Sequence, residues 1–353
     1  MSGSPLRTRR RRWIAGSAAL AARLVHLALT GRGAPGLALA AGGALGQSAA
    51  GLIRRGGFAF GSRIGITVAH PDAHAAKLAL DDALREIAAL DALLSVQMPG
   101  SPLAQLNAAG AIDAPDPRLV DVLALARRWS GLTGGAFDAS VQPLWLVFAR
   151  AAARGQLPAR ADVAQAAARI GWSGVSDSAA RIELQRPGMA LTLNGISQGY
   201  AADRALALLR SRGIRHALVD SGECAVLGKR AGGENWRLGI RDPRNTAGLL
   251  GSLEPGDAAV ATSGDYEYVF SADRRHHHIF DPRTGYSPTE LAAVTVVAPR
   301  AADADALSTA CMVLGHAAAR ALIATLPGVE ALFVFKDQRQ QATGGFEALF
   351  SRG

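Results

Sequence analysis

The chain has 353 residues, of which 49% are hydrophobic, 19% are charged and 40 are glycine, so it can bury a sizeable core and is neither disordered nor fibrous. Its formal net charge is +9, and the first 55 residues hold nine arginines and no acidic residue. Because basic and acidic residues balance in the remainder, the composition argues against a nucleic-acid partner for the folded body.

The N-terminal segment, residues 1–50, is predicted to be an export signal. Arginines at positions 9–12 precede a small-residue apolar stretch, and Ala38-Leu39-Ala40 is typical of a cleavage site. Arg10-Arg11-Arg12-Trp13-Ile14 matches the twin-arginine pattern, so a periplasmic location is expected. A mitochondrial transit peptide and a single membrane anchor are the alternatives. Polar residues interrupt the apolar run that an anchor would need, at Arg23, His26 and Arg32.

The first half of the body is expected to begin with a strand and continue with helices. The strand, over residues 61–69, is indicated by the alternation of Ile64, Ile66 and Val68 with smaller or polar residues. The expected helices, the first of them N-capped by Asp72, cover residues 72–94, 117–130 and 159–170.

Beyond residue 181 the pattern predicts strands separated by two helices. The strands are expected over residues 181–184, 190–193, 216–220, 237–241, 293–298 and 331–336. The helices are expected over residues 200–212 and 302–314, and a glycine follows each. This mixture predicts an α+β fold over residues 57–350, with one or two mixed or antiparallel sheets flanked by helices.

The cysteines and the histidine run are interpreted as structural. Cys224 and Cys311 have no metal-type spacing and are expected to be buried small side chains. His276 and His277 are expected at the solvated end of a hairpin, because alternation along a strand would separate neighbouring side chains of a transition-metal site.

One short motif suggests a serine hydrolase. Residues 195–199 read Gly-Ile-Ser-Gln-Gly, which matches the nucleophile elbow GxSxG between an expected strand and an expected helix. Asp265 and His278 follow Ser197 in the chain order that such a triad requires. The pattern is short, and the glycines also suit a plain strand-to-helix turn.

A second set of segments favours phosphate and metal chemistry. Residues 131–138 form a glycine-rich loop, residues 262–266 read Thr-Ser-Gly-Asp-Tyr, and residues 278–285 lead into an Asp-Pro turn. On the helix over 302–314, Asp305 and Thr309 are spaced i, i+4, so their oxygens share one face. A carboxylate and a hydroxyl are hard ligands that suit Mg²⁺ and are too few for Zn²⁺.

In order and spacing these segments resemble the ApbE family of FAD:protein FMN transferases, from about residue 60 to residue 314. The resemblance includes Phe60-Gly61-Ser62, residues 101–107, the Gly-Ala-Phe-Asp loop at 135–138, and residues 195–203, 262–266, 278–285 and 305–309. Members of the family usually have alanine at the position of Ser197, so the resemblance implies that Ser197 is not a nucleophile.

The resemblance implies Mg²⁺-dependent transfer of FMN from FAD to a Ser or Thr hydroxyl of an acceptor protein, with release of AMP. It implies metal ligands at Asp305, Thr309 and the Gly195 carbonyl. The FAD pocket would be lined by Ala136, Phe137 and Asp138, with apolar walls from Phe60 and Ile279. His278, beside the Asp281 turn, would act as base toward the acceptor.

The resemblance also implies FAD binding at three further positions, and at each of them this sequence departs from the residue that the family usually has. Thr192 stands where Asp is common, Gln198 where Lys or Glu is common, and Gln97 where an aromatic residue usually stacks on adenine. Two functions therefore remain besides the hydrolase: a working flavin transferase, and a periplasmic FAD-binding scaffold that has lost transfer. The form of residues 193–199 resembles accessory proteins of nitrous oxide respiration, which implies a flavoprotein subunit of a membrane respiratory complex as acceptor.

Overall fold

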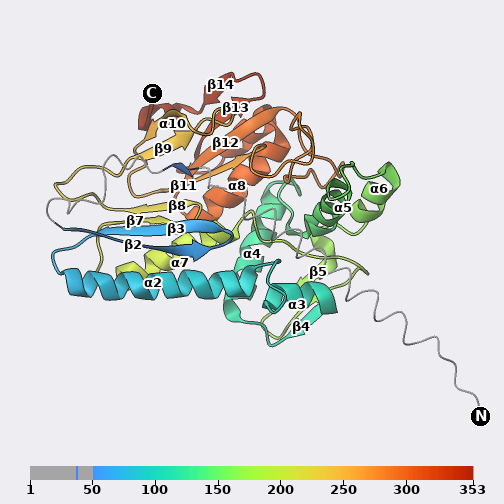
Figure 1. Cartoon of the computed structure of the whole chain (residues 1–353), viewed down its shortest axis with the longest axis horizontal. Helices are drawn as coiled ribbons and strands as arrows, with labels where there is room; N and C mark the ends of the chain where they lie inside the picture. The colour runs from blue at the N-terminus through green and yellow to red at the C-terminus, as the bar shows by residue number, and fades with distance from the viewer. Residues whose placement is uncertain (1–36, 39–50, 353) are drawn as a thin grey trace, which may run out of the picture.

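The computed structural model describes residues 37–38 and 51–352, and within them the chain folds around three antiparallel sheets (Figure 1). Every strand pairing in this part of the chain is antiparallel. The α+β fold expected from the sequence is confirmed, although the described residues form three sheets where one or two were expected.

The largest sheet forms the middle of the molecule and has the strand order β14-β13-β12-β11-β8-β7-β3-β2. Its strands are β2 (Leu52–Ala59), β3 (Ser62–Ala69), β7 (Ala217–Asp220), β8 (Cys224–Leu227), β11 (Ala259–Gly264), β12 (Leu291–Ala298), β13 (Glu330–Phe335) and β14 (Gln340–Ala342). Helices cover one face of it, namely α2 (Ala73–Leu94), α7 (Ser197–Ser211), α8 (Ala301–Leu314) and α9 (His316–Ile323). Figure 1 shows α2 running along β2 and β3.

The opposite face of the large sheet packs against a smaller sheet with the order β1-β9-β10-β15. This sheet comprises β1 (Leu37–Ala38), β9 (Leu238–Arg241), β10 (Leu249–Leu253) and β15 (Phe350–Arg352), and α10 (Gly344–Leu349) lies beside it. Trp236, Leu253 and Phe346 join Val226 and Val260 of the large sheet in one buried cluster. The strands β7, β8, β11, β12 and β13 of the large sheet are therefore mostly buried on both faces, whereas β2 at its edge is largely exposed.

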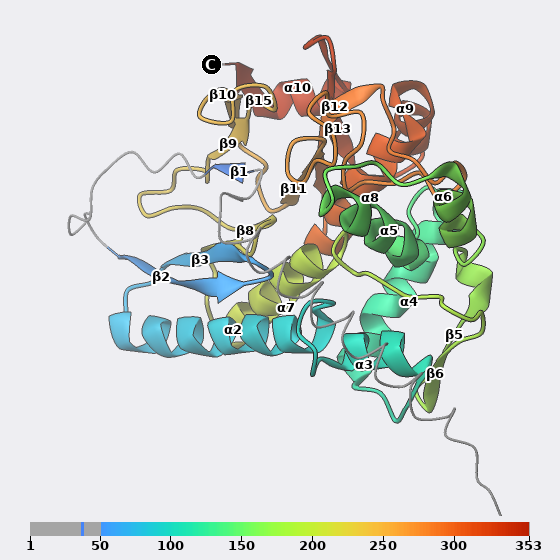
Figure 2. The same cartoon turned by 45° about the vertical axis from the view of Figure 1, so that its right-hand side comes forward.

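A lobe of shorter elements lies beside α8 (Figure 2). Its helices are α3 (Pro102–Ala109), α4 (Pro117–Leu132), α5 (Gln142–Ala152) and α6 (Arg160–Ala167), with 3-10 turns η1 (Ala139–Val141) and η2 (Trp172–Gly174). Its strands are β4 (Ala111–Asp113), β5 (Val175–Asp177) and β6 (Arg181–Leu184). The indole Nε1 of Trp129 in α4 donates to Asp303 of α8 at 2.8 Å, which ties the lobe to the sheet.

Local sequence explains the start of α2 and the turn between β2 and β3. The Asp72 carboxylate accepts hydrogen bonds from the backbone N–H groups of His74 and Ala75, which caps α2 as expected. At the tip of the β2–β3 hairpin, Phe60 and Gly61 both have positive φ, +51° and +73°. A two-residue turn of this kind matches the twist of the paired strands, although an aromatic residue is unusual in it.

The strand expected over residues 190–193 is absent, and that expectation was wrong. Leu191 and Leu193 are buried in alternation, but their backbone pairs with no other strand of the described residues. Instead, the Asn107 side chain binds both the N–H and the C=O of Leu191, at 2.7 and 2.8 Å. The Thr192 N–H donates to the Ala139 carbonyl at 2.7 Å. A side chain and a loop therefore satisfy the backbone groups that a strand would have used.

Several elements were not expected from the sequence, namely β1, β2, α3, β4, α5, β5, β8, β10, β11, α9 and the C-terminal β14, α10 and β15. Most of them are short, and short segments carry little periodicity. The predicted export signal lies outside the described residues, apart from β1. No helix in the described part of the chain combines the length and apolar character that crossing a membrane requires.

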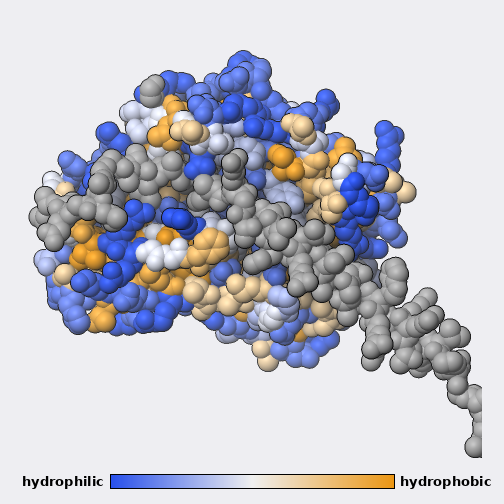
Figure 3. All heavy atoms as spheres, viewed as in Figure 1, coloured by the Kyte–Doolittle hydropathy of each residue, from blue (hydrophilic) through white to orange (hydrophobic). Residues whose placement is uncertain are grey.

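Hydrophilic side chains predominate on the face shown in Figure 3, where the hydrophobic groups are small and scattered among them. Both cysteines are unpaired and buried, as expected, with 1% of Cys224 and none of Cys311 exposed. They act as small core residues in the two main hydrophobic clusters.

Candidate functional site

The first part of the site lies between α8 and the turn that precedes α7. A Cβ placed on Gly195 would lie 3.0 Å from Thr309 Oγ1 and 3.3 Å from the Phe137 ring. Because Gly195 has no side chain, its backbone can lie close to the Thr309 hydroxyl and to the Phe137 ring. Three of the predicted site residues, from three distant segments, are brought together here.

Asp305 lies one helical turn before Thr309 and is only 4% exposed. Its Oδ2 accepts a hydrogen bond of 3.0 Å from the Gly199 N–H, in the first turn of α7. Burial raises the pKa of Asp305 above its usual value. A buried carboxyl group with one hydrogen-bond donor is poorly compensated as an anion, so a cation beside it would stabilise the charged form.

The close approach of α7 to α8 depends on Gly199 and Asp203. A Cβ at Gly199 would lie 2.5 Å from the Ala301 carbonyl carbon and 2.8 Å from Ala302 Cα. The Asp203 carboxylate accepts hydrogen bonds from the N–H groups of Ala301 and Ala302 at 2.8 and 3.0 Å. Asp203 thus caps α8 from the neighbouring helix and helps to fix the position of Asp305.

The predicted pocket loop over residues 136–138 is buried and held from both sides. The Phe137 N–H donates to Thr133 Oγ1 at 3.0 Å, and the side chains of Ala136 and Phe137 are each 3% exposed. Asp138 Oδ1 accepts hydrogen bonds from the N–H and the hydroxyl of Ser140, at 2.8 and 2.6 Å. Burial raises the pKa of Asp138. Thr192 lies close to this loop through its hydrogen bond to Ala139.

The Gln198 side chain lies against the β2–β3 hairpin. Its Nε2 is 3.5 Å from Ser62 Oγ, and a Cβ on Gly222, which has φ +106°, would overlap the Gln198 amide. The Ser221 hydroxyl donates to the Gln198 carbonyl at 2.7 Å. Gln198 therefore has a defined position without the charge that Lys or Glu would bring.

Two further predicted site residues, Phe60 and Gln97, are more exposed. The backbone N–H of Phe60 hydrogen-bonds to the Asp91 carboxyl group, and burial raises the pKa of that group because this bond offsets only part of the effect. This contact ties the strained hairpin tip to α2. Gln97 is exposed beyond the end of α2, and its backbone N–H donates to Ser95 Oγ at 3.2 Å.

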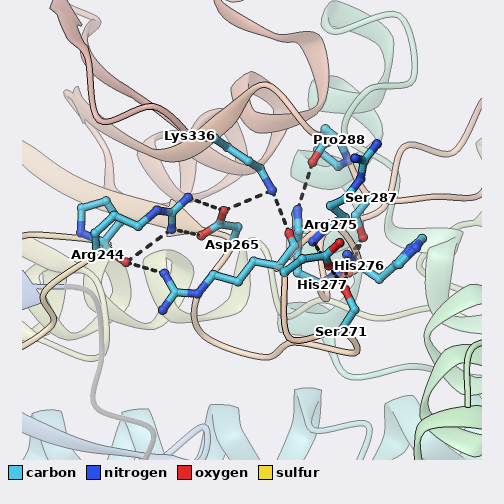
Figure 4. Close-up of polar contacts among 12 residues, drawn as sticks. Arg244, Asp265, Ser271, Arg275, His276, His277, Ser287, Pro288 and Lys336 are labelled. Atoms are coloured by element: carbon cyan, nitrogen blue, oxygen red, sulfur yellow. Dashed lines mark hydrogen bonds and ion pairs between the residues drawn. The ribbon is translucent and has the colours of Figure 1, made fainter. Parts of the chain in front are cut away.

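The histidine run lies in a loop fixed by the contacts that Figure 4 draws. His277 is fully buried, with its Nε2 3.1 Å from the Pro288 carbonyl and its N–H donating to Ser287 Oγ at 2.9 Å. The expectation that His277 is solvated was therefore wrong, because the loop folds back onto residues 287–288. Lys336 Nζ donates to the Arg274 carbonyl at 2.7 Å and holds the start of the run.

His278 and Asp281 occupy different surroundings. Burial lowers the pKa of His278 to about 4, so its imidazole is neutral at neutral pH. Ile279, next in the chain, is buried in the main core. The Asp281 carboxylate binds the side chain of Arg283 at 2.8 and 2.9 Å and accepts its backbone N–H at 2.9 Å. Asp281 therefore shapes the turn, and its carboxylate is engaged by Arg283.

The residues of the hydrolase hypothesis do not assemble into a triad. Ser197 is 3% exposed in the first turn of α7. Asp265 is fully buried, and its carboxylate is bound by the two terminal guanidinium nitrogens of Arg244 at 2.7 and 2.9 Å and by Lys336 at 3.2 Å. With two cations on this carboxylate, Asp265 is an ion-pair centre rather than the orienting acid of a histidine.

Replacing Ser197 with Ala is expected to leave the FMN transfer that the family resemblance implies within about threefold of wild type, since the buried hydroxyl belongs to no triad. The same enzyme should resist labelling by a fluorophosphonate. Intact-protein mass spectrometry after labelling, beside a transfer assay, checks both expectations. Stoichiometric modification at Ser197 would restore the hydrolase hypothesis.

Several site residues were missed by sequence reasoning. The Ser263 hydroxyl contacts the hydroxyls of Ser308 and Thr309, and the Glu223 carboxylate accepts the Thr262 N–H at 3.1 Å. Burial, and after it the charge of Asp305, raises the pKa of Glu223 well above its usual value. Ser263 belongs to a motif that the sequence singled out, but Ser308 and Glu223 carried no local signal.

The donor set fits a magnesium ion better than a transition metal. In the described residues, no three or more His, Cys, Asp or Glu side chains are grouped so that they could hold a metal ion. The groups assigned to the ion are the buried Asp305 carboxylate, the Thr309 hydroxyl and the backbone at Gly195. Hard oxygen donors that leave several positions for phosphate and water are the usual environment of Mg²⁺.

Comparison with known proteins gives consistent results. The family model described as the ApbE family matches residues 60–333. The FAD:protein FMN transferase of Treponema pallidum is 37% identical over 294 residues, which cover 76% of this chain and 80% of that protein. The FAD:protein FMN transferase of Salmonella typhimurium is 32% identical over 247 residues, covering 66% and 70%.

Solved structures of similar proteins agree with the fold. The ApbE protein of Thermotoga maritima has a TM-score of 0.76 and 27% identity, covering 85% of this chain and all of that chain. The apo form of the flavinyl transferase ApbE from Pseudomonas stutzeri has a TM-score of 0.74 and 29% identity, covering 86% and 98%.

Proposed function

The chain belongs to the ApbE family, and we propose that it is a flavin transferase that moves FMN from FAD to a Ser or Thr hydroxyl of an acceptor protein. The acceptor oxygen bonds to the phosphorus of the FMN half as the bond to the AMP half breaks. AMP leaves with that electron pair, and the acceptor hydroxyl loses its proton. The observation that carries the proposal is the joining of Asp305, Thr309, Gly195 and Phe137 in one site.

We assign the binding of Mg²⁺ to the Asp305 carboxylate, the Thr309 hydroxyl and the Gly195 carbonyl. When bound, the ion neutralises charge on the pyrophosphate during transfer. The residues around it supply position and exclusion of water. Phe137 closes the site beside Gly195, and the Gly199 N–H holds Asp305 in one orientation.

His278 is the base in this proposal, and it takes the proton of the acceptor hydroxyl. Its lowered pKa keeps the ring unprotonated at neutral pH, the form that can accept a proton. A pyrophosphate nearby would raise that pKa, because opposite charges favour the imidazolium.

The scaffold alternative is less well supported. Its basis is the departures at Gln97, Thr192 and Gln198, which leave the FAD pocket with fewer charges. Asp305 nevertheless remains buried on the same helix as Thr309, at a cost that FAD binding alone would not require.

The cellular setting belongs to the same proposal. Arg10-Arg11-Arg12-Trp13-Ile14 supports export through the twin-arginine route to the periplasm. The acceptor would then be a flavoprotein subunit of a membrane respiratory complex, with nitrous oxide respiration the candidate pathway.

Metal removal tests the proposed chemistry. The protein is incubated with FAD and a purified acceptor fragment, with MgCl₂ or with excess EDTA, and flavin fluorescence on the denatured acceptor is measured. Transfer is expected only with Mg²⁺ and should return fully when Mg²⁺ is added back after chelation. Equal labelling in EDTA would contradict the metal assignment. Retained FAD with no labelling under any condition would favour the scaffold.

A further inference from the structure

We propose that Ser263 is a positioning residue that fixes the hydroxyl proton of Thr309, so that the Thr309 oxygen presents its lone pairs to the cation. The inference rests on the proposed function, because it concerns the same Mg²⁺ site. It assigns a role to a side chain of β11 that acts on the metal only through Thr309.

Three hydroxyl contacts link β11 to α8. Ser263 Oγ lies 3.1 Å from Thr309 Oγ1 and 2.8 Å from Ser308 Oγ. The Ser308 hydroxyl in turn donates to the Asp305 carbonyl at 2.9 Å. Ser308 is fully buried, and Ser263 sits at the penultimate position of β11, paired with Val294 of β12. The hydroxyls therefore lie where sheet and helix are in direct contact.

Counting protons gives this chain of contacts a single direction. A hydroxyl carries one proton, and a carbonyl can only accept. The Ser308 proton is therefore used on the Asp305 carbonyl, so Ser263 must donate to Ser308. Ser263 then has no proton left, and Thr309 must donate to Ser263. Only this arrangement supplies all three contacts with a proton.

The direction matters for metal binding. A hydroxyl that ligates a cation must point its proton away from the ion, because the O–H dipole would otherwise repel it. With its proton directed to Ser263, Thr309 keeps its lone pairs free on the side of Gly195. Groups that orient a metal ligand in this way typically change metal affinity about 10- to 100-fold when removed.

The decisive comparison is between Ser263→Ala and two matched variants. Ser308→Ala removes the acceptor of Ser263 but leaves the contact between Ser263 and Thr309. Thr295→Val breaks another buried hydroxyl pair of the same sheet, the 2.8 Å contact between Thr295 and Thr262, away from Thr309. It therefore measures the effect of losing a buried hydroxyl in this sheet without removing a group that contacts Thr309.

The readout is calorimetric titration of MgCl₂ into each protein with FAD present and no acceptor, so that binding is measured without turnover. Ser263→Ala is expected to weaken Mg²⁺ binding about 10-fold. Ser308→Ala should weaken it less, Thr295→Val should match wild type within about twofold, and Ser263→Thr should recover most of the affinity. Thermal unfolding midpoints establish that each variant is folded.

Two outcomes overturn the proposal. Wild-type affinity in folded Ser263→Ala would show that Thr309 needs no orienting partner. An equal loss in Thr295→Val would show that the effect is general packing. If wild type itself bound no Mg²⁺ with FAD present, the metal assignment of the proposed function would be wrong. That result can be told apart from the two above, because in both of them wild type binds Mg²⁺.

Discussion

Asp305→Asn is expected to lower FMN transfer at least ~100-fold while the thermal unfolding midpoint stays within a few degrees of wild type. A metal that neutralises transferring charge contributes several kcal/mol, and each ~1.36 kcal/mol corresponds to a factor of ten in rate. Asparagine keeps the shape of the side chain and an oxygen for the Gly199 N–H, which lies 3.0 Å from Oδ2. What it removes is the buried charge, so chemistry should suffer more than folding.

Asp303→Asn is the matched control for this variant. Asp303 lies two residues earlier in α8, and its carboxylate accepts the Trp129 indole N–H at 2.8 Å. Asparagine retains an acceptor for that indole, so transfer should remain within about threefold of wild type. Steady-state transfer rates at saturating FAD, measured over a range of Mg²⁺ concentrations, compare the two variants. Equal rates for Asp305→Asn and wild type would contradict the proposal that Asp305 binds Mg²⁺.

Gly199→Ala is expected to destabilise the fold by at least ~3 kcal/mol, because it forces two helix backbones apart. The added Cβ would meet the backbone of Ala301 and Ala302, at 2.5 Å from a carbonyl carbon and 2.8 Å from a Cα. Backbone atoms cannot rotate away as a flexible side chain can, so α7 and α8 would have to separate. Such a loss is a large fraction of the stability of an ordinary domain.

Gly131→Ala provides the comparison for the glycine variant. Gly131 lies in the last turn of α4, is exposed, and has no heavy atom within 4 Å of the position that a Cβ would take. Alanine is a better helix former than glycine, so stability should be unchanged or rise by up to ~1 kcal/mol. Urea unfolding midpoints measure both variants. A Gly199→Ala protein as stable as wild type would mean that α7 and α8 do not pack as closely as the structure shows.

Sequence reasoning reached the parts of the fold that local patterns determine. The Asp72 cap, the long helix after it and the strand from residue 62 to 69 follow from side chains within one segment. The strand predicted over residues 190–193 is absent because the alternation of Leu191 and Leu193 indicates burial and not strand pairing. The partner of that backbone is Asn107, 84 positions from Leu191, which periodicity cannot reveal.

For the candidate site, too, sequence reasoning placed residues within one element but missed contacts between elements. The i, i+4 spacing of Asp305 and Thr309 placed both on one face of a helix, and both are where that spacing put them. The contact of Ser263 with Ser308 and Thr309 depends on how β11 packs against α8, which no local pattern specifies. The burial of His277 was missed because its partners, Ser287 and Pro288, belong to the loop that folds back on it.

The measurement that tests the central claim most directly is the intact mass of an acceptor fragment together with the AMP released in the same reaction. With the protein, FAD and Mg²⁺, the acceptor should gain the mass of FMN attached through a phosphoester, and one AMP should form per acceptor modified. Replacing the acceptor Ser or Thr with Ala should abolish the gain. An unmodified acceptor, or AMP formed with no matching mass gain, would contradict the assignment of this chain as a flavin transferase.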